Sequence, residues 1–155
     1  MNLSENFSLK EFTKSTTARR NDIDNTPENE HLDNAVALFA NVVQKVRNHF
    51  GRTTINSGYR SPELNEKVGG SSKSQHCKGQ AADIECPGIS NYKVAKWIED
   101  NLEYDQLILE FYTPGISDSG WVHVSYVNDS PSNRRKSMTA MKVDGKTQYK
   151  LGLIK

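Results

Sequence analysis

Apolar positions along the chain predict one long amphipathic helix and a second, shorter one. Between Thr26-Pro27 and Gly51, apolar residues recur every three or four positions, the spacing of a helix that buries one face. Proline suits the first helical position, and Gly51 suits the left-handed residue that often follows a helix. Ser90 is expected to cap the second helix. The core-facing residues of that helix are Val94, Trp97, Ile98 and Leu102.

The polar stretches predict where the chain turns. Ser8 and Glu11 have the spacing of a capping box, so a short helix is expected to begin there. Residues 19–25 are expected to form a loop. The Gly-, Ser- and Asn-rich residues 61–73 are expected to form another loop, at the surface.

Short runs of β-branched and aromatic residues predict strands at residues 53–57, 81–86, 106–112 and 121–127. The last two runs, QLILEFY and WVHVSYV, flank a Pro/Gly loop, which favours a hairpin at the centre of a sheet. Alternation would place Trp121, His123 and Ser125 on one face. Asp144-Gly145 predicts a further hairpin within residues 137–153. The fold class expected is α+β, with a small, mostly antiparallel sheet and helices packed on one side.

Size and charge narrow the possible functions. The 155 residues are expected to form a single domain, residues 1–155, and to act as a monomer. The net charge is +1 with no basic stripe, so no nucleic-acid partner is expected. The short cluster Arg134-Arg135-Lys136 is expected to be a solvated loop.

No apolar run suggests a membrane segment or a signal peptide, which predicts synthesis in the cytoplasm. Two cysteines, Cys77 and Cys86, are too few for a disulfide framework and are expected to be reduced.

The stretch from Ser57 to Asp83 carries the main candidate chemistry. His76 and Asp83 are separated by a segment containing Gly79, which allows a tight turn between them. Imidazole nitrogen and carboxylate oxygen are both zinc ligands, and a catalytic zinc takes three protein ligands and keeps one position open. His123, inward on a predicted central strand, is the natural third ligand. Spacing alone does not distinguish this site from a core histidine beside an ordinary surface loop.

Three motifs in this chain resemble those of one enzyme family. Residues 74–83, SQHCKGQAAD, resemble the S-x-H-x-x-G-x-A-x-D motif of the zinc D-alanyl-D-alanine carboxypeptidase family of peptidoglycan peptidases. Residues 121–125, WVHVS, resemble the second metal motif of that family, and residues 57–61, SGYRS, resemble its upstream element. The similarity runs from about residue 6 to about residue 126. It implies the hedgehog/DD-peptidase fold, with a small antiparallel sheet, flanking helices and one zinc in a groove.

The resemblance also implies roles for individual residues. His76, Asp83 and His123 would bind one Zn²⁺, which would bring the pKa of a water molecule from about 15.7 toward about 7. Arg60 would stabilise the oxyanion formed at the substrate carbonyl. The alternative for Arg60 is a surface ion pair with Glu63 or Glu66. Substrate contacts are expected from Ser74, Tyr59 and Trp121, although Ser74 could instead cap its own loop.

The general base is the point at which the sequence departs from the family. Many members carry an acidic residue three positions before the last histidine, but Gly120 occupies that position here. Glu110 is the preferred substitute, because a carboxylate within an apolar strand is costly unless it is paired or functional. Glu110 could instead face solvent at a strand end. Asp118 is the reserve candidate for the base.

These residues predict a zinc-dependent enzyme that hydrolyses an amide bond in peptidoglycan stem peptides, its expected partner. The resemblance favours a phage or prophage endolysin that reaches the cell wall after holin-mediated release. A D-alanyl-D-alanine carboxypeptidase is one alternative. Another is a non-catalytic, zinc-stabilised module for wall binding or for the virion. Three candidate ligands rather than the four of a structural zinc favour catalysis.

Overall fold

A six-stranded mixed sheet forms the centre of the computed structural model, which describes residues 1–155. Its strands lie in the order β3 (Thr54–Ser57), β4 (Ala81–Glu85), β6 (Trp121–Ser125), β5 (Gln106–Glu110), β7 (Lys136–Val143) and β8 (Lys146–Leu151). All neighbours are antiparallel except β5 and β7, which are parallel. A separate two-stranded sheet joins β1 (Asn2–Ser4) to β2 (Phe7–Ser8). The predicted α+β class, with a mostly antiparallel sheet, is confirmed.

The long helix is present but begins later than predicted. It consists of α3 (Asn29–Leu38), a π-helical turn η1 (Phe39–Val43) and α4 (Gln44–Phe50). The predicted start at Thr26-Pro27 is wrong, because the backbone N–H of Thr26 donates to Asp24 Oδ1 at 3.0 Å and this part of the chain turns before the helix. The predicted end is confirmed, since Gly51 follows the helix with φ of +90°.

The structure contains helices where loops were expected. Helix α5 (Pro62–Lys67) lies within residues 61–73, where Ser61 Oγ accepts a hydrogen bond from Leu64 N at 3.3 Å. Leu64 is buried and anchors this helix to the protein. Helix α2 (Thr16–Arg20) overlaps the expected loop at residues 19–25 and is capped by Ser15. The capping box of Ser8 and Glu11 is confirmed at the start of α1 (Leu9–Thr13).

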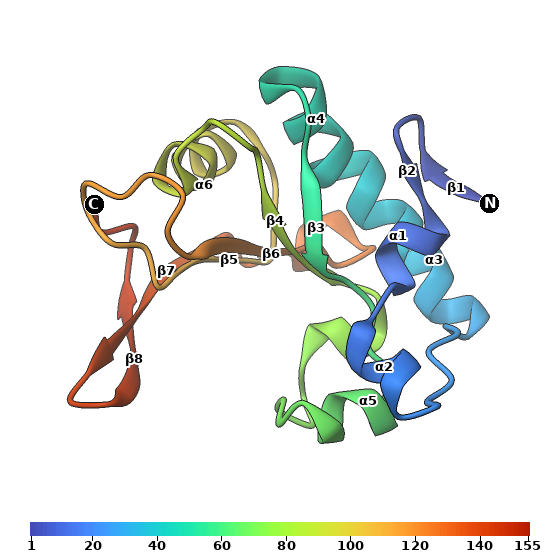
Figure 1. Cartoon of the computed structure of the whole chain (residues 1–155). Helices are drawn as coiled ribbons and strands as arrows, with labels where there is room; N and C mark the ends of the chain where they lie inside the picture. The colour runs from blue at the N-terminus through green and yellow to red at the C-terminus, as the bar shows by residue number, and fades with distance from the viewer.

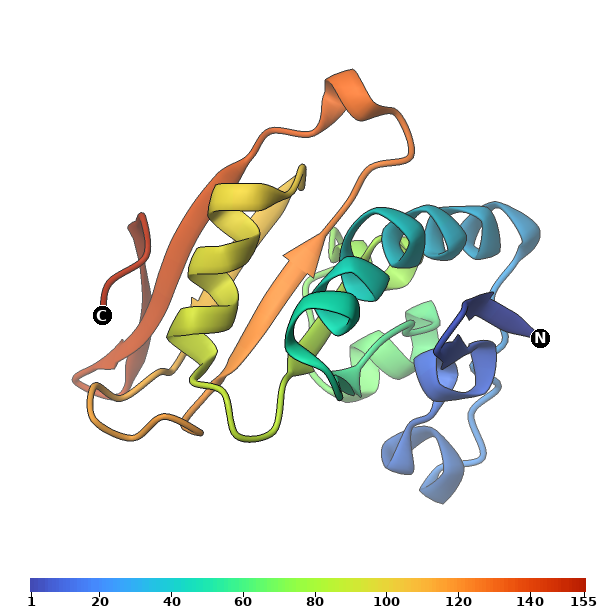
Figure 2. The same ribbon diagram turned by 90° about the horizontal axis from the view of Figure 1, so that it is seen from above.

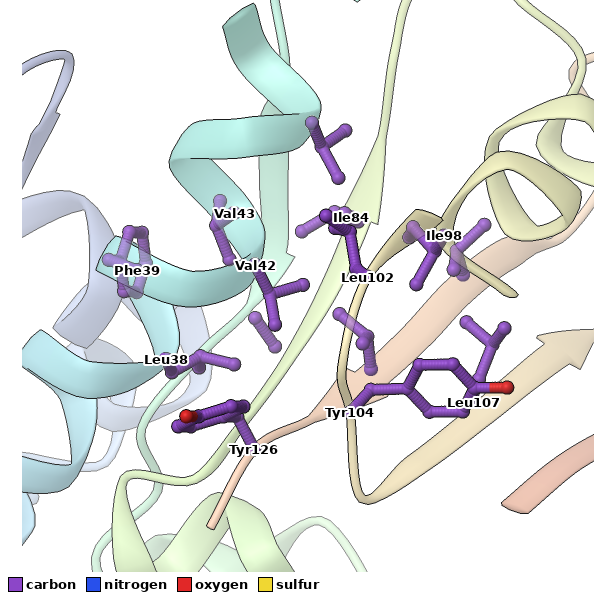
Figure 3. Packing of buried hydrophobic residues seen from close by; sticks show 14 of the residues in the cluster. Leu38, Phe39, Val42, Val43, Ile84, Ile98, Leu102, Tyr104, Leu107 and Tyr126 are labelled. Atoms are coloured by element: carbon purple, nitrogen blue, oxygen red, sulfur yellow. The ribbon is translucent and has the colours of Figure 1, made fainter. Parts of the chain in front are cut away.

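One face of the sheet packs against the helices to form the core. Leu107 and Leu109 of β5 and Val122 and Val124 of β6 are fully buried on this face. Helix α6 (Asn91–Asn101) lies across both strands (Figure 2). Figure 3 shows side chains of the long helix, of β4 and of α6 meeting in one apolar cluster. The cluster accounts for the apolar alternation that is visible in the sequence.

The opposite face of the sheet holds the polar side chains. Residues directly opposite on neighbouring strands form a row of Asp83, His123 and Ile108. The adjacent row contains Trp121, Glu110, Ala140 and Tyr149. In Figure 1 this face is flanked by the segment carrying α5 on one side and by the β7–β8 hairpin on the other. The sheet therefore supplies a floor on which polar groups from four strands lie near one another.

The C-terminal hairpin confirms the turn predicted from Asp144-Gly145. Both residues have positive φ, 52° and 78°, as a tight two-residue hairpin turn requires. Every residue of β8 is exposed, and β8 forms one edge of the sheet. No helix is both long and apolar enough to cross a membrane.

Candidate active site

Three side chains at the polar face form a compact set of candidate metal ligands. Asp83 and His123 lie directly opposite each other on β4 and β6, with His123 Nδ1 3.0 Å from Asp83 Oδ1. His76 comes from the 3₁₀ turn η2 (Gln75–Lys78), and its Nε2 lies 3.4 Å from the same oxygen. One donor atom from each residue falls within 4.8 Å of the other two. The structure thus brings together the three residues predicted as zinc ligands.

The SGYR segment fixes the orientation of His76. Its Nδ1 donates a hydrogen bond to the carbonyl oxygen of Gly58 at 2.7 Å, which turns Nε2 toward the site. A Cβ at Gly58 would lie 2.2 Å from the carbonyl oxygen of Phe12, so only glycine allows this approach. The backbone N–H of Arg60 donates to the carbonyl of His76 at 3.1 Å. The upstream motif therefore positions the first ligand.

The donor set fits zinc in chemistry as well as in spacing. Burial alone would raise the pKa of Asp83, but hydrogen bonds with His123 and His76 hold that pKa well below its usual range. The carboxylate is therefore ionised and available as a ligand. Two imidazoles and one carboxylate are a ligand set of catalytic zinc sites, and three protein ligands leave a position open.

A cleft of about 510 Å³ lies over these ligands. The segment before η2 contributes Ser71, Lys73 and Ser74 to one wall, and the sheet contributes Gln106, Ile108, Glu110 and Trp121 to the floor. Arg134 and Tyr149, which follow β6 in the chain, line the cleft as well. The volume falls within the usual range for ligand sites, roughly 300–1,000 Å³.

Arg60 lines the cleft with an unsatisfied donor. Its Nε is buried and has no hydrogen-bond partner, and no ion pair joins Arg60 to Glu63 or Glu66. The alternative of a surface ion pair is therefore absent from the structure. The Trp121 indole N–H lies beside the carboxyl of Glu110 on the neighbouring strand and acts to lower its pKa. Because buried donors are normally paired, the Nε–H of Arg60 is suited to hydrogen-bond a ligand.

Glu110 lies on the floor of the cleft rather than at a solvent-facing strand end. It is opposite Trp121 and two residues along β5 from Ile108, which is opposite His123. Burial, followed by the charge of Asp83, raises the pKa of Glu110 above its ordinary value. A carboxyl with a raised pKa beside a metal site is well suited to exchange protons near neutral pH.

The backbone excludes a general base at position 120. Gly120 has φ of +66°, and a Cβ there would lie 2.0 Å from the carbonyl oxygen of Glu110. No acidic side chain can occupy this position without moving β5. The reserve candidate Asp118 is exposed and lines a separate depression with Glu85 and Cys86, away from the cleft. Of the three positions considered for the base, only Glu110 places a carboxyl in the cleft.

Ser74 and Tyr59, both predicted to contact substrate, have different surroundings. Ser74 lines the cleft, and its Oγ accepts a hydrogen bond from the backbone N–H of His76 at 3.2 Å, so it also caps η2. Tyr59 is only 4% exposed and packs in the hydrophobic core, with its hydroxyl 3.4 Å from His31 Nδ1. The structure does not bring Tyr59 into the cleft.

Two of the cleft residues that were not predicted from the sequence, Arg134 and Tyr149, come from the chain after β6. Arg134 lies in an exposed loop, as expected, but the sequence did not predict that its guanidinium is bound to the buried carboxylate of Asp105. Tyr149 belongs to a strand with no motif of its own. The only signal in the sequence was Asp105 at the edge of an apolar strand, an unusual place for an unpaired charge.

Comparison with known proteins agrees with this geometry. The family model for Peptidase M15 matches residues 5–125, a range that contains the three ligands, Arg60 and Glu110. No curated protein shows a significant match to the chain. Peptidases of this family depend on zinc and act on peptidoglycan-type substrates. The chain therefore belongs to the Peptidase M15 family, the family of the zinc D-alanyl-D-alanine carboxypeptidases.

Proposed function

We propose that this protein hydrolyses an amide bond within the stem peptides of peptidoglycan, as a lytic enzyme of the endolysin type. One observation carries the proposal above all others. Around one cleft lie three candidate metal ligands, a buried unpartnered guanidinium N–H and a carboxyl of raised pKa, with Asp83, His123 and Glu110 on the sheet and His76 and Arg60 on segments beside it. These are the groups that hydrolysis of an amide requires.

Each group has a defined role in the proposed reaction. His76, Asp83 and His123 would hold Zn²⁺, which when bound activates water and polarises the substrate carbonyl. Glu110 as carboxylate takes the proton from the attacking water and then delivers it to the leaving amine nitrogen. Arg60 donates from its guanidinium to the oxygen of the carbonyl, where negative charge develops. Because its pKa is raised, Glu110 is able to both accept and release that proton.

The charges around the cleft favour an anionic peptide. Three cationic side chains, Arg60, Lys73 and Arg134, line the cleft with two anionic ones, Asp83 and Glu110, and the buried carboxylate of Asp105 pairs with Arg134. A bound divalent cation would therefore make the cleft positive. Stem peptides carry free carboxylates, so their charge complements that of the cleft.

Two alternatives remain testable. A non-catalytic module would have no use for a partly buried carboxylate of raised pKa beside the ligands, so Glu110 argues against it. A D-alanyl-D-alanine carboxypeptidase is favoured by the cations of the cleft, because Arg134 or Lys73 could bind a C-terminal carboxylate. Release through a holin and a monomeric state remain predictions from the sequence.

Digestion of purified peptidoglycan followed by mass spectrometry of the released fragments tests the proposal. The wild-type protein should release peptides with a new amine and a new carboxylate at one bond, and chelation should abolish the release. Loss of a terminal D-alanine alone would identify the carboxypeptidase. Zinc-loaded, folded protein that releases no fragment would support the non-catalytic module and overturn the proposal.

A further inference from the structure

Arg134 is a rigidly held cation at the cleft. Its Nε donates to Asp105 Oδ1 at 3.0 Å and its Nη2 donates to Asp105 Oδ2 at 2.8 Å, while its backbone N–H donates to Oδ1 at 3.0 Å. Asp105 is only 2% exposed, whereas the side chain of Arg134 is 57% exposed. The buried carboxylate thus fixes the plane of a guanidinium that faces solvent within the cleft.

Part of this guanidinium is free to bind a ligand. A guanidinium carries five N–H groups, and Asp105 occupies the edge formed by Nε and one N–H of Nη2. The edge formed by Nη1 and the second N–H of Nη2 has no partner among the hydrogen bonds of the protein. Such an edge matches the two oxygens of a carboxylate. Because Arg134 is already ordered, binding there would cost little side-chain entropy.

Asp105 also links Arg134 to the metal-binding segment. Gln75 Nε2 donates to Asp105 Oδ2 at 3.0 Å, and Gln75 immediately precedes the ligand His76. The neighbouring Arg135 has a different role, since it donates to the carbonyl oxygens of Leu102 and Glu99 and does not line the cleft. The cation at Arg134 is therefore held in a fixed position relative to the ligands.

We propose that the free edge of Arg134 binds a carboxylate of the substrate and so selects peptides that carry this group at a fixed distance from the cleaved bond. The inference rests on the proposed function and extends it to a residue outside the family match at residues 5–125. The carboxylate could be the C-terminus of the peptide or a free carboxyl group within it. Both present the same two oxygens to the guanidinium.

Synthetic stem peptides in which each carboxylate is replaced in turn by a carboxamide test the inference. With wild-type protein, replacement at one position should lower kcat/KM about 10–100-fold, the range for a charge-assisted hydrogen-bonded pair. The sensitive position distinguishes a C-terminal carboxylate from an internal one. In Arg134→Gln, the difference in kcat/KM between the carboxylate and carboxamide peptides should vanish. In Arg134→Lys the difference should be intermediate, because lysine keeps the charge but cannot present two parallel N–H groups to the carboxylate.

The controls separate binding from folding. The ratio of kcat/KM for two peptides does not depend on the fraction of folded enzyme. The double variant Arg134→Gln/Asp105→Asn avoids leaving a buried carboxylate unpaired, and it should also lose the discrimination. Arg20→Gln removes an exposed arginine outside the cleft and should keep the wild-type ratios. Equal carboxamide effects in wild type and Arg134→Gln at every position would overturn the inference.

Failure of the proposed function would give a different result. If zinc-loaded wild-type protein cleaved none of the peptides, calorimetric titration of the same protein with the free-carboxylate and carboxamide peptides would still measure the contribution of Arg134. If one free-carboxylate peptide binds more tightly than its carboxamide, and Arg134→Gln removes that difference, Arg134 binds the carboxylate even though the protein does not cleave the peptide. Equal dissociation constants would reject it.

Discussion

Strands β6 and β8 both contribute to the cleft, but they are built differently. Four of the five residues of β6 are buried, and the strand lies between β4 and β5 near the middle of the sheet. All six residues of β8 are exposed, and the strand forms an edge. His123 of β6 has its position set by neighbours on both sides, whereas Tyr149 of β8 is 59% exposed.

This difference divides the cleft into a chemical part and a recognition part. Ligands and proton carriers must hold their geometry closely, and packed central strands supply that rigidity. Substrate contacts at an exposed edge can change with little effect on folding. The family match ends at residue 125 and so includes β6 but not the β7–β8 hairpin. Variants in the two parts should therefore differ in both the size and the kind of their effects.

The largest effect is expected from loss of a metal ligand. His76→Ala and His123→Ala should each lose zinc and lower kcat/KM by about 1,000-fold or more, because metal activation is worth several kcal/mol in the transition state. Metal analysis of folded protein and peptide hydrolysis measure the two effects. Full zinc occupancy in either variant would refute the ligand assignment.

The next largest effect is expected at Glu110. Glu110→Gln keeps the size of the side chain but removes the proton acceptor, so kcat should fall at least about 100-fold. Zinc content should remain that of the wild type, which separates this variant from the histidine variants. Near wild-type hydrolysis with zinc bound would show that another group is the base.

The raised pKa of Glu110 also predicts effects of pH. In the metal-free protein, burial and the charge of Asp83 favour the protonated form of Glu110. A carboxyl with a raised folded-state pKa stabilises the fold fully below its unfolded-state pKa, and this stabilisation is lost as pH rises through the folded-state value. Metal-free Glu110→Gln should therefore melt at a higher temperature than metal-free wild type at pH 7, but not at pH 4.

A smaller effect, on stability, is expected at Gly120, which lies just before β6 and against the end of β5. Gly120→Ala combines positive φ with a clash against Glu110, and it should cost about 2–3 kcal/mol, or about 4–12 °C in Tm. Gly115→Ala is the matched control, since Gly115 also has positive φ, 86°, but has open space around its Cβ position. Equal decreases of Tm in the two variants would show that the contact with β5 does not contribute to stability.

Sequence patterns anticipated the rigid part of the molecule better than the exposed part. Alternation along residues 121–125 placed His123 on the same face as Trp121, because successive side chains of a strand point to opposite faces of the sheet. The motifs identified Asp83 and His76, but only the register of β4 and β6 brings Asp83 opposite His123. Local patterns specify faces well, whereas they do not specify which distant strands become neighbours.

What the sequence missed has one local cause and two causes in the tertiary fold. Helix α5 was missed because its Gly- and Ser-rich surroundings obscured the cap formed by Ser61 and Pro62. The role of Arg134 was missed because its partner Asp105 is 29 residues earlier in the chain. Tyr149 reaches the cleft only through the pairing of β8 with β7 and of β7 with β5. Contacts of this kind depend on the tertiary fold and leave no periodic signal in the sequence.

The smallest effect is expected at the exposed edge. Tyr149→Ala should leave Tm within about 1 °C of the wild-type value, because surface substitutions usually change stability by no more than about 0.5 kcal/mol. Zinc content and kcat should be unchanged, while KM for a stem peptide should rise about 2–10-fold through loss of an aromatic contact at the cleft. Ile116→Ala is the matched control, since Ile116 is an exposed apolar residue outside the cleft. A fall in kcat or in zinc content for Tyr149→Ala would mean that the hairpin belongs to the chemical part of the cleft, and the division between central and edge strands would have to be abandoned.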